Sequence, residues 1–250
     1  MKNIEIIHDE IIKFIKDYYH DNNLKGAILG ISGGKDSAVV AGLFVEALGR
    51  ENVIGMWLPC HSKKEDYNDA KLLSDYLGIE LIEYDLTKIY DEFVNNIKLD
   101  DKYLEDSNIN IKPRLRMSTL YYHAAMYSKL NNGVYLVPGT SNKCELYVGY
   151  FTKGGDNVSD IQVLADLTVD EVISLGEYMD LPKEVIFKIP DDGLSGKSDE
   201  EKLGVTYKNI AKVINGEEVE KEIKEKIERL HNRNLHKFNV PTYRKSDRIK

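Results

Sequence analysis

The sequence predicts an α/β protein in which a parallel sheet carries helices on both faces. Four apolar segments of strand length occur near residues 26–31, 53–58, 79–84 and 134–138. Four segments with apolar residues at helical spacing alternate with them, at 36–48, 66–77, 87–96 and 114–131. Strands that alternate with helices form parallel sheets, because each helix carries the chain back across a face of the sheet. Ligands of such sheets bind beyond the carboxyl ends of the strands.

The remaining elements are predicted to be helices and polar loops. An amphipathic helix precedes the first strand, at 3–20. Further helices are predicted in the last third of the chain, at 168–179, from Pro182, at 205–214 and at 217–235. Three polar segments, two of them rich in glycine, read as loops at Lys98–Ile111, Gly149–Asp160 and 188–204. The 250 residues suffice for one large α/β domain, and we expect a single domain over residues 1–250.

Composition excludes several classes of function. The net charge of −8 argues against general nucleic-acid binding and against an anionic membrane surface. Only two cysteines, Cys60 and Cys144, are present, too few for a disulfide framework or a four-cysteine zinc site. The sequence has no run of eighteen apolar residues and no signal-peptide pattern. We therefore expect a cytoplasmic enzyme that works on small molecules, with no nucleic-acid or membrane partner.

A glycine turn after the first strand is the most informative motif. Residues Ile28–Ser37 read Ile-Leu-Gly-Ile-Ser-Gly-Gly-Lys-Asp-Ser, an apolar strand that turns sharply into a helix. Backbone N–H groups in such a turn can surround a phosphate, while the helix N-terminus and Lys35 add positive charge. The spacing fits neither the Walker loop nor the Gly-x-Gly-x-x-Gly fingerprint. It resembles the Ser-Gly-Gly-x-Asp-Ser loop of the ATP pyrophosphatases, which implies cleavage of ATP to AMP and pyrophosphate.

A second motif follows the last predicted strand, in the segment Val137–Glu145. The hydroxyl of Thr140 can donate to a nucleotide. Glu145 lies at the start of a helix and could supply an oxygen ligand to Mg²⁺, which prefers carboxylate, phosphate and water. Taken alone, a glutamate at this position is more often the acid that a helix N-terminus favours than a metal ligand. The two motifs together favour the metal-ligand interpretation.

Five motifs occur in an order that resembles the ammonia-dependent NAD synthetases, a family of the ATP pyrophosphatase superfamily. They are Ser32–Ser37, Lys112–Met117, Gly139–Glu145, Gly149–Lys153 and His236–Lys237. The resemblance implies an adenine nucleotide α-hydrolase-like fold with additional C-terminal helices, and a homodimer. It also implies the activity: MgATP adenylates the nicotinate carboxylate of deamido-NAD, and ammonia then displaces AMP to form NAD.

The resemblance assigns roles to individual residues of this chain. Asp36 and Glu145 would hold Mg²⁺, and Asp36 and Lys153 would serve catalysis. Residues that would contact ATP are Gly30, Ile31, Ser32, Gly33, Gly34, Lys35, Asp36, Ser37 and Thr140. Residues that would contact deamido-NAD are Arg114, Lys153, Asp160, His236 and Lys237. The cations also have simpler interpretations: Arg114 as a solvated helix-start residue, Lys153 as an exposed loop residue, and His236 and Lys237 as helix C-terminal charges.

Three positions depart from the pattern of the resembled family. Val169 stands where a lysine is usual, Asp191 where Thr or Ser is usual, and Asn157 where a second glycine is common. The first two replace residues that contact ATP in the family. Lys188 and Lys197 lie nearby in sequence and could compensate for the lost cation.

Glutamine-dependent relatives carry a nitrilase-like glutaminase domain, for which this chain leaves no room ahead of its phosphate loop. We therefore expect ammonia to come from solution or from a separate protein. Two alternatives stay open at this point. One is another amidating or thiolating ATP pyrophosphatase, although the RNA-modifying members need a basic face or zinc-binding cysteines. The other is a module that binds adenine nucleotide without turnover, which the departures at Val169 and Asp191 would support.

Overall fold

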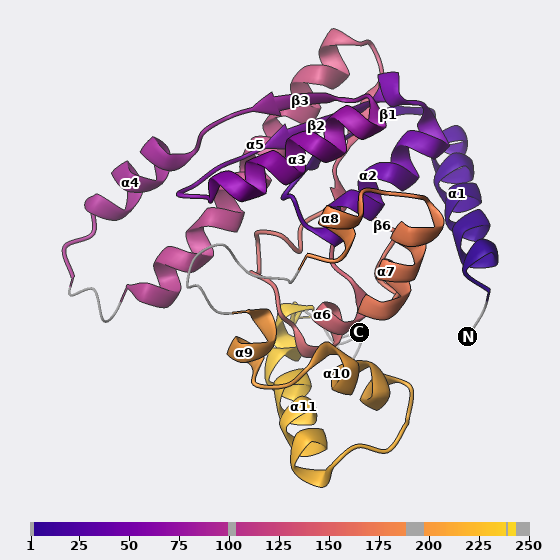
Figure 1. The fold of residues 1–250 in the computed structure, drawn as a ribbon. Coiled ribbons are helices and arrows are strands. Elements are labelled where there is room, and N and C mark those ends of the chain that lie inside the picture. The colour runs from indigo at the N-terminus through magenta and orange to yellow at the C-terminus, as the bar shows by residue number, and fades with distance from the viewer. Residues whose placement is uncertain (1–2, 100–103, 189–197, 239, 244–250) are drawn as a thin grey trace, which may run out of the picture.

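The main sheet of the protein has four parallel strands (Figure 1). The computed structural model describes residues 3–99, 104–188, 198–238 and 240–243. The sheet is built from β1 Leu24–Gly30, β2 Val53–Trp57, β3 Glu80–Glu83 and β4 Val134–Leu136, in the order β3-β2-β1-β4. The two central strands, β1 and β2, pair without a shift in register, from Ala27 opposite Val53 to Gly30 opposite Met56. The predicted fold class is confirmed.

Successive side chains of β1 and β2 point to opposite faces, and each face has its own apolar cluster. Leu29 and Val53 belong to the cluster that packs under α1 (Ile4–Asp21), α2 (Lys35–Leu48) and α3 (Lys64–Leu77). Ile28 and Met56 belong to the cluster under α4 (Thr87–Asn95) and α5 (Glu105–Leu130). This period of two explains why β2 is apolar throughout and β1 is apolar from Gly26 to Gly30, since neither face of the sheet meets solvent there.

The last helices of the chain, from α9 (Asp199–Leu203) to α11 (Lys221–Asn234), lie below the sheet in Figure 1. In the described part of the chain, the helices after β4, together with the short helix that precedes β2, are η1 Arg50–Asn52, α6 Lys143–Val148, α7 Val169–Tyr178, α8 Lys183–Ile186, α9 Asp199–Leu203, α10 Tyr207–Ile214, α11 Lys221–Asn234 and η3 Leu235–Lys237. A third apolar cluster, including Cys144, Ile210 and Ile227, joins α6, α10 and α11. None of the helices in the described part of the chain has the length and apolar character needed to span a membrane.

The strand expected at 134–138 leaves the main sheet early. After Leu136 the chain turns, and β5 (Pro138–Gly139) pairs in parallel with β6 (Ile161–Gln162) in a second sheet. The backbone N–H of Val137 donates to Asp160 Oδ2 at 2.8 Å, and the Val137 carbonyl accepts from the backbone N–H of Asp160 at 2.9 Å. Asp160 thus holds the chain where it moves from one sheet to the other.

The prediction of a loop over Lys98–Ile111 is wrong in its second half, because α5 begins at Glu105. Pro113 lies inside this helix, although the residue before a proline usually avoids helical geometry. Contacts far along the chain hold the first turns of α5. The Lys112 ammonium lies 4.9 Å from the centre of the Tyr90 ring, and Thr152 Oγ1 donates to Asn110 Oδ1 at 2.7 Å. Tertiary packing therefore overrides a polar, asparagine-rich local sequence.

The predicted loop over 188–204 also contains a helix, α9, in its described part. Ser198 caps this helix with the reciprocal pattern of a capping box: its side chain accepts from the Glu201 N–H at 3.2 Å, and Glu201 Oε2 accepts from the Ser198 N–H at 2.7 Å. The sequence Ser198-Asp-Glu-Glu201 carries the signal for such a cap. The polar composition of residues 188–204 favoured a loop prediction in spite of this capping signal.

Candidate active site

The phosphate loop links the carboxyl end of β1 to the start of α2. Gly33 has a φ of +78°, a conformation that side chains other than glycine rarely adopt. A Cβ at Gly33 would also lie only 2.5 Å from the carbonyl oxygen of Asp66 in α3. Glycine is therefore required at this position both by the turn and by the close approach of α3. Gly34 is the N-cap of α2 and leaves the first N–H groups of that helix without a side-chain cap.

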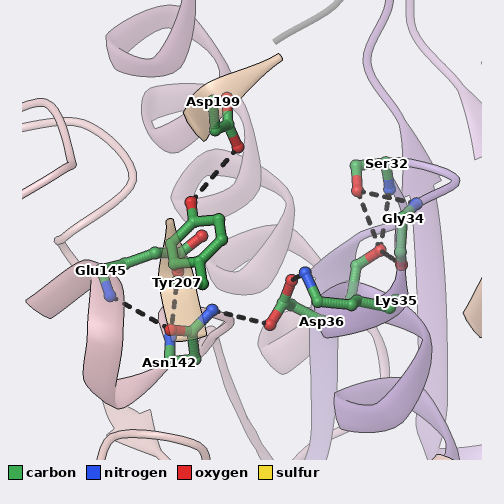
Figure 2. A network of polar contacts seen from close by, with 9 residues as sticks. Ser32, Gly34, Lys35, Asp36, Asn142, Glu145, Asp199 and Tyr207 are labelled. Atoms are coloured by element: carbon green, nitrogen blue, oxygen red, sulfur yellow. Dashed lines mark hydrogen bonds and ion pairs between the residues drawn. The ribbon is translucent and has the colours of Figure 1, made fainter. Parts of the chain in front are cut away.

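Two serines hold the loop in shape (Figure 2). Ser37 Oγ accepts from the Ser32 N–H at 3.2 Å and donates to the carbonyl of Gly34 at 2.9 Å. Ser32 Oγ accepts from the Gly34 N–H at 3.2 Å. Both residues are predicted to contact ATP, and in this structure their hydroxyls are bonded within the loop, where they fix its backbone.

The two residues that precede Ser32, Gly30 and Ile31, have different surroundings. Ile31 continues the pairing of β1, since its N–H donates to the Met56 carbonyl at 2.9 Å, and its side chain lies in the core. Only the backbone of Ile31 can therefore serve a ligand. Gly30 ends β1, and a Cβ there would meet no atom nearer than 3.8 Å.

Lys35 and Asp36 form an ion pair at the start of α2. Lys35 Nζ lies 2.8 Å from Asp36 Oδ2, and the lysine side chain is only 4% exposed. Burial lowers the pKa of Lys35, but the negative charges of Asp36, Glu145 and Asp199 outweigh it, so the pKa of Lys35 is raised. The buried site therefore keeps a permanent positive charge beside the phosphate loop.

Glu145 approaches this pair from α6 by way of Asn142. The side chain of Asn142 caps α6 by accepting from the Glu145 N–H at 3.1 Å, and its Nδ2 donates to Asp36 Oδ1 at 3.0 Å. Glu145 Oε2 accepts from the Asn142 N–H at 3.0 Å. Burial and the charge of Asp36 raise the pKa of Glu145 well above its ordinary value. The structure thus brings the two predicted metal ligands into one electrostatically coupled site.

Asp199 and Tyr207 complete this polar network, and the sequence prediction missed both. The buried Asp199 accepts hydrogen bonds from Tyr150 at 3.0 Å and from Tyr207 at 3.4 Å. Figure 2 shows Tyr207 beside Glu145, and the centre of its ring lies 6.0 Å from Lys35 Nζ. Burial, followed by the charges of Glu145 and Asp199, raises the pKa of Tyr207, so its hydroxyl stays protonated.

The residues present fit Mg²⁺ that is shared with a bound triphosphate. No group of three or more His, Cys, Asp or Glu side chains that could hold a metal ion is found among the described residues. Mg²⁺, however, is usually bound by one or two carboxylates together with phosphate oxygens and water. Asp36 and Glu145 supply two carboxylates beside a phosphate loop, and their mutual repulsion favours a cation between them.

Three of the predicted substrate-binding cations gather at a second place, around the loop after α6. Arg114, on α5, donates from Nε and Nη2 to the carbonyl of Lys153 at 3.3 and 3.1 Å. Lys153 Nζ donates to the carbonyl of His236 in η3 at 3.0 Å. His236 Nδ1 lies 2.9 Å from the Arg233 carbonyl oxygen. Residues from three distant parts of the sequence therefore meet on one exposed surface.

The other two predicted substrate contacts hold the protein's own backbone. Lys237 Nζ donates to the carbonyls of Gly149 and Phe151 at 2.6 and 2.8 Å, and burial lowers its pKa. Asp160 Oδ1 accepts from the Tyr121 hydroxyl at 3.1 Å, while its Oδ2 holds Val137. Burial, the charge of Asp160 and this hydrogen bond raise the pKa of Tyr121 to about 12.

Thr140 and the positions that depart from the family pattern can also be placed. Thr140 is half-buried between β5 and the Asn142 cap. Val169 packs in the apolar cluster with Cys144 and Ile210, so it replaces a cation with core packing. Asn157 Oδ1 accepts from the Gly154 N–H at 2.8 Å within its loop.

Of the two lysines expected to compensate for the missing cation, Lys188 lies among the described residues and Lys197 does not. Lys188 Nζ lies 2.7 Å from Asp66 Oδ1 and 2.5 Å from Asp69 Oδ2, both in α3, and so is paired within the protein. Lys197 and Asp191 lie outside the described residues.

Comparisons with known proteins agree with this geometry. The sequence profile of the family described as NAD synthase matches residues 7–241. The NH(3)-dependent NAD(+) synthetase of Carboxydothermus hydrogenoformans is 37% identical, over 93% of this chain and 94% of that protein. A solved structure of NMN synthetase from Francisella tularensis superposes with a TM-score of 0.88 at 32% identity and covers 98% of this chain and 99% of its own. The NH3-dependent NAD synthetase from Campylobacter jejuni gives a TM-score of 0.77 at 29% identity, with coverages of 97% and 100%. These similarities, together with the phosphate loop and its two carboxylates, establish that the chain belongs to the NAD synthase family.

Proposed function

We propose that this protein is an ammonia-dependent NAD synthetase that amidates deamido-NAD at the expense of ATP. A carboxylate is a poor electrophile, so it must first be activated. The nicotinate carboxylate attacks the α-phosphorus of ATP and breaks the α–β phosphoanhydride bond, which releases pyrophosphate and leaves an acyl-adenylate. Ammonia then attacks the acyl carbon, AMP leaves, and the nitrogen loses a proton to give the amide.

The observation that carries this proposal is the joining of the phosphate loop to the Glu145 helix. Asn142 contacts Asp36 directly, so the carboxylates of Asp36 and Glu145 lie beside the buried Lys35. In the proposed complex, the loop N–H groups and Lys35 bind the β- and γ-phosphates, which become the leaving group. Bound Mg²⁺ would further offset the charge on the triphosphate. Arg114 and Lys153 are proposed to bind the substrate, where Lys153 would stabilise the oxyanion that forms on the acyl oxygen when ammonia attacks the acyl-adenylate.

The products provide the direct test of the activity. Purified protein given MgATP, deamido-NAD and ammonium is expected to form NAD, AMP and pyrophosphate in equal amounts. ADP and inorganic phosphate would contradict the proposed bond cleavage. Glutamine supplied in place of ammonium is expected to give little product, because we propose that residues 1–250 act as one synthetase domain without glutaminase activity. Binding of ATP without any turnover would favour the alternative of a non-catalytic nucleotide-binding module.

A mononucleotide substrate is a second candidate, favoured by one observation. The superposition on the Francisella tularensis NMN synthetase, with a TM-score of 0.88, covers nearly the whole of both chains. The same adenylation and amidation on nicotinate mononucleotide would yield NMN. Measuring kcat/KM for both substrates in parallel separates the two functions, and we expect the larger value with deamido-NAD.

We also propose that the protein is a homodimer in the cytoplasm. Large apolar side chains are exposed on one face of α4 and α5, among them Ile89, Phe93, Tyr122 and Met126. A shallow cavity between the two helices is lined by Ile89, Leu115 and Tyr122. Such a patch on a metabolic enzyme is typical of a surface that another chain covers.

The proposed interface makes a testable prediction. Wild-type protein is expected to sediment at about twice the chain mass of 28.6 kDa. Tyr122, which is 70% exposed, is expected to lie in the interface, so Tyr122→Glu would place a charge there and yield folded monomers. Phe14→Glu, at an exposed aromatic position on α1, serves as the matched control and is expected to remain dimeric. Monomeric wild-type protein with full activity would rule out the dimer.

A further inference from the structure

Asn142 contacts both carboxylates of the candidate site, although none of the roles assigned above involves it. Its side chain is fully buried. The amide oxygen accepts from the Glu145 N–H at 3.1 Å, and the amide nitrogen donates to Asp36 Oδ1 at 3.0 Å. Its own backbone N–H donates to Glu145 Oε2 at 3.0 Å. A single residue therefore links two acids that lie more than a hundred positions apart in the sequence.

These contacts fix the orientation of Asp36. One of its oxygens, Oδ2, pairs with Lys35 Nζ at 2.8 Å, while Oδ1 accepts from Asn142. Each carboxylate oxygen can accept more than one contact, so both keep a lone pair for a further ligand. Without Asn142, the Asp36 carboxylate would lose the contact at Oδ1 and keep the pair with Lys35 at Oδ2, so that it could rotate about its last side-chain bond.

We propose that Asn142 is a positioning residue that orients Asp36 and Glu145 toward the metal ion of bound MgATP. The proposal rests on the proposed function, because it assigns the two acids to that ion. Residues that hold metal ligands in place contribute to affinity even though they never touch the metal, and their loss typically costs about 10- to 100-fold in metal affinity or activity.

The chemistry of the position explains why asparagine suits it. Any residue here must accept a hydrogen bond from the Glu145 N–H, which Ser, Thr, Asp and Asn can all do. The same side chain must also donate to Asp36. An aspartate would instead place a second carboxylate oxygen against Asp36, and a serine would be too short to cap α6 and reach Asp36 at once. Asparagine supplies both functions from one planar amide.

This difference allows the cap to be separated from the contact with Asp36. Asn142→Ser keeps a good helix cap and removes the donor to Asp36. Thr168→Ala is the matched control: Thr168 caps α7 in the same reciprocal pattern, and the partner of its side chain and backbone in that capping box is Glu171. The control therefore removes a capping box of the same kind while leaving the Asp36 contact intact.

The readout is metal binding, measured separately from turnover. Each protein is saturated with an ATP analogue that has a methylene group between the α- and β-phosphorus, and Mn²⁺ binding is followed by electron paramagnetic resonance. For Asn142→Ser we expect a melting temperature close to that of the wild type and an Mn²⁺ dissociation constant about tenfold higher or more. For Thr168→Ala we expect a lower melting temperature and an unchanged Mn²⁺ dissociation constant.

Every outcome decides the proposal. Wild-type Mn²⁺ affinity in a folded Asn142→Ser protein overturns it. If that variant does not fold, Asn142→Thr replaces it, and failure of both to fold while Thr168→Ala folds assigns Asn142 a structural role and also overturns the proposal. Wild-type protein without amidation of either nicotinate substrate would refute the proposed function instead, a result that the binding measurement on the Asn142 variants does not depend on.

Discussion

Glu145→Gln is expected to lower the turnover number at least about tenfold, because metal-based charge stabilisation contributes several kcal/mol to reactions of this kind. The substitution keeps the shape of the side chain and removes its charge. The Gln side chain can still accept a hydrogen bond from the Asn142 N–H, as Glu145 Oε2 does at 3.0 Å, so the cap of α6 is expected to persist. The melting temperature is accordingly expected to change little.

The chain offers a matched control for this substitution. Glu171 makes the same capping contact in α7, where its Oε2 accepts from the Thr168 N–H at 2.8 Å. Glu171→Gln is expected to retain the wild-type rate. Steady-state rates measured across a range of Mg²⁺ concentrations would distinguish the two positions. Full activity of Glu145→Gln at every Mg²⁺ concentration would mean that Glu145 serves only as the acid at a helix start.

Local sequence signals predicted the central part of the fold well. The helix expected over 36–48 is observed at Lys35–Leu48, and the strand expected over 53–58 at Val53–Trp57. Both segments are largely apolar, and breaker or polar residues flank them: Gly34 and Gly49 around the helix, Asn52 and Pro59 around the strand. Their conformation therefore follows from nearby residues. The phosphate loop was also predictable, since a glycine turn between a strand and a helix can adopt few shapes.

Elements that depend on distant contacts could not be predicted in this way. The first turns of α5 are polar, and they become helical where Lys112 meets Tyr90 and Asn110 meets Thr152. The sequence of these first turns has no periodicity from which contacts with Tyr90 and Thr152 could be predicted. The same limit applies to Ser32, whose hydroxyl could equally bind phosphate or the loop, and whose bond to the Gly34 N–H depends on the folded turn.

In the candidate site, too, local sequence signals predicted some features, while contacts with distant residues could not be predicted. The sequence singled out Asp36 and Glu145 because each follows a strand in a recognisable motif, and their role as metal ligands stays a prediction. Asn142 carries a local signal, since Asn142-x-x-Glu145 matches a capping pattern, but its bond to Asp36 depends on the neighbouring positions of β1 and β4 in the sheet. Asp199 has a capping signal beside it at Ser198, yet its partners Tyr150 and Tyr207 come from separate segments.

Lys153→Ala is expected to reduce NAD formation about a hundredfold while leaving the fold almost unchanged. The loss of rate follows if the ammonium group stabilises the oxyanion that forms on the acyl oxygen as ammonia attacks, since removal of one such group typically costs about 10²- to 10³-fold. Stability is expected to persist because the Lys153 side chain is exposed and donates its hydrogen bond to the His236 carbonyl at the surface. The bonds from Arg114 go to the backbone carbonyl of Lys153, which alanine retains.

Two further variants make this experiment decisive. Lys16→Ala, an exposed helical lysine on α1, is expected to match the wild type in both rate and melting temperature, since such surface substitutions usually change stability by less than about 0.5 kcal/mol. Lys153→Arg keeps the charge but spreads it over a planar group, and we expect it to recover part of the rate. Thermal unfolding and initial rates are measured on the same preparations. A Lys153→Ala protein with wild-type rate would remove Lys153 from the reaction and leave it as a surface residue that ties its loop to η3. If Lys153→Ala lowered both stability and rate, Lys153 would have a structural role. A group that acts only on the substrate does not affect unfolding that is measured without substrate.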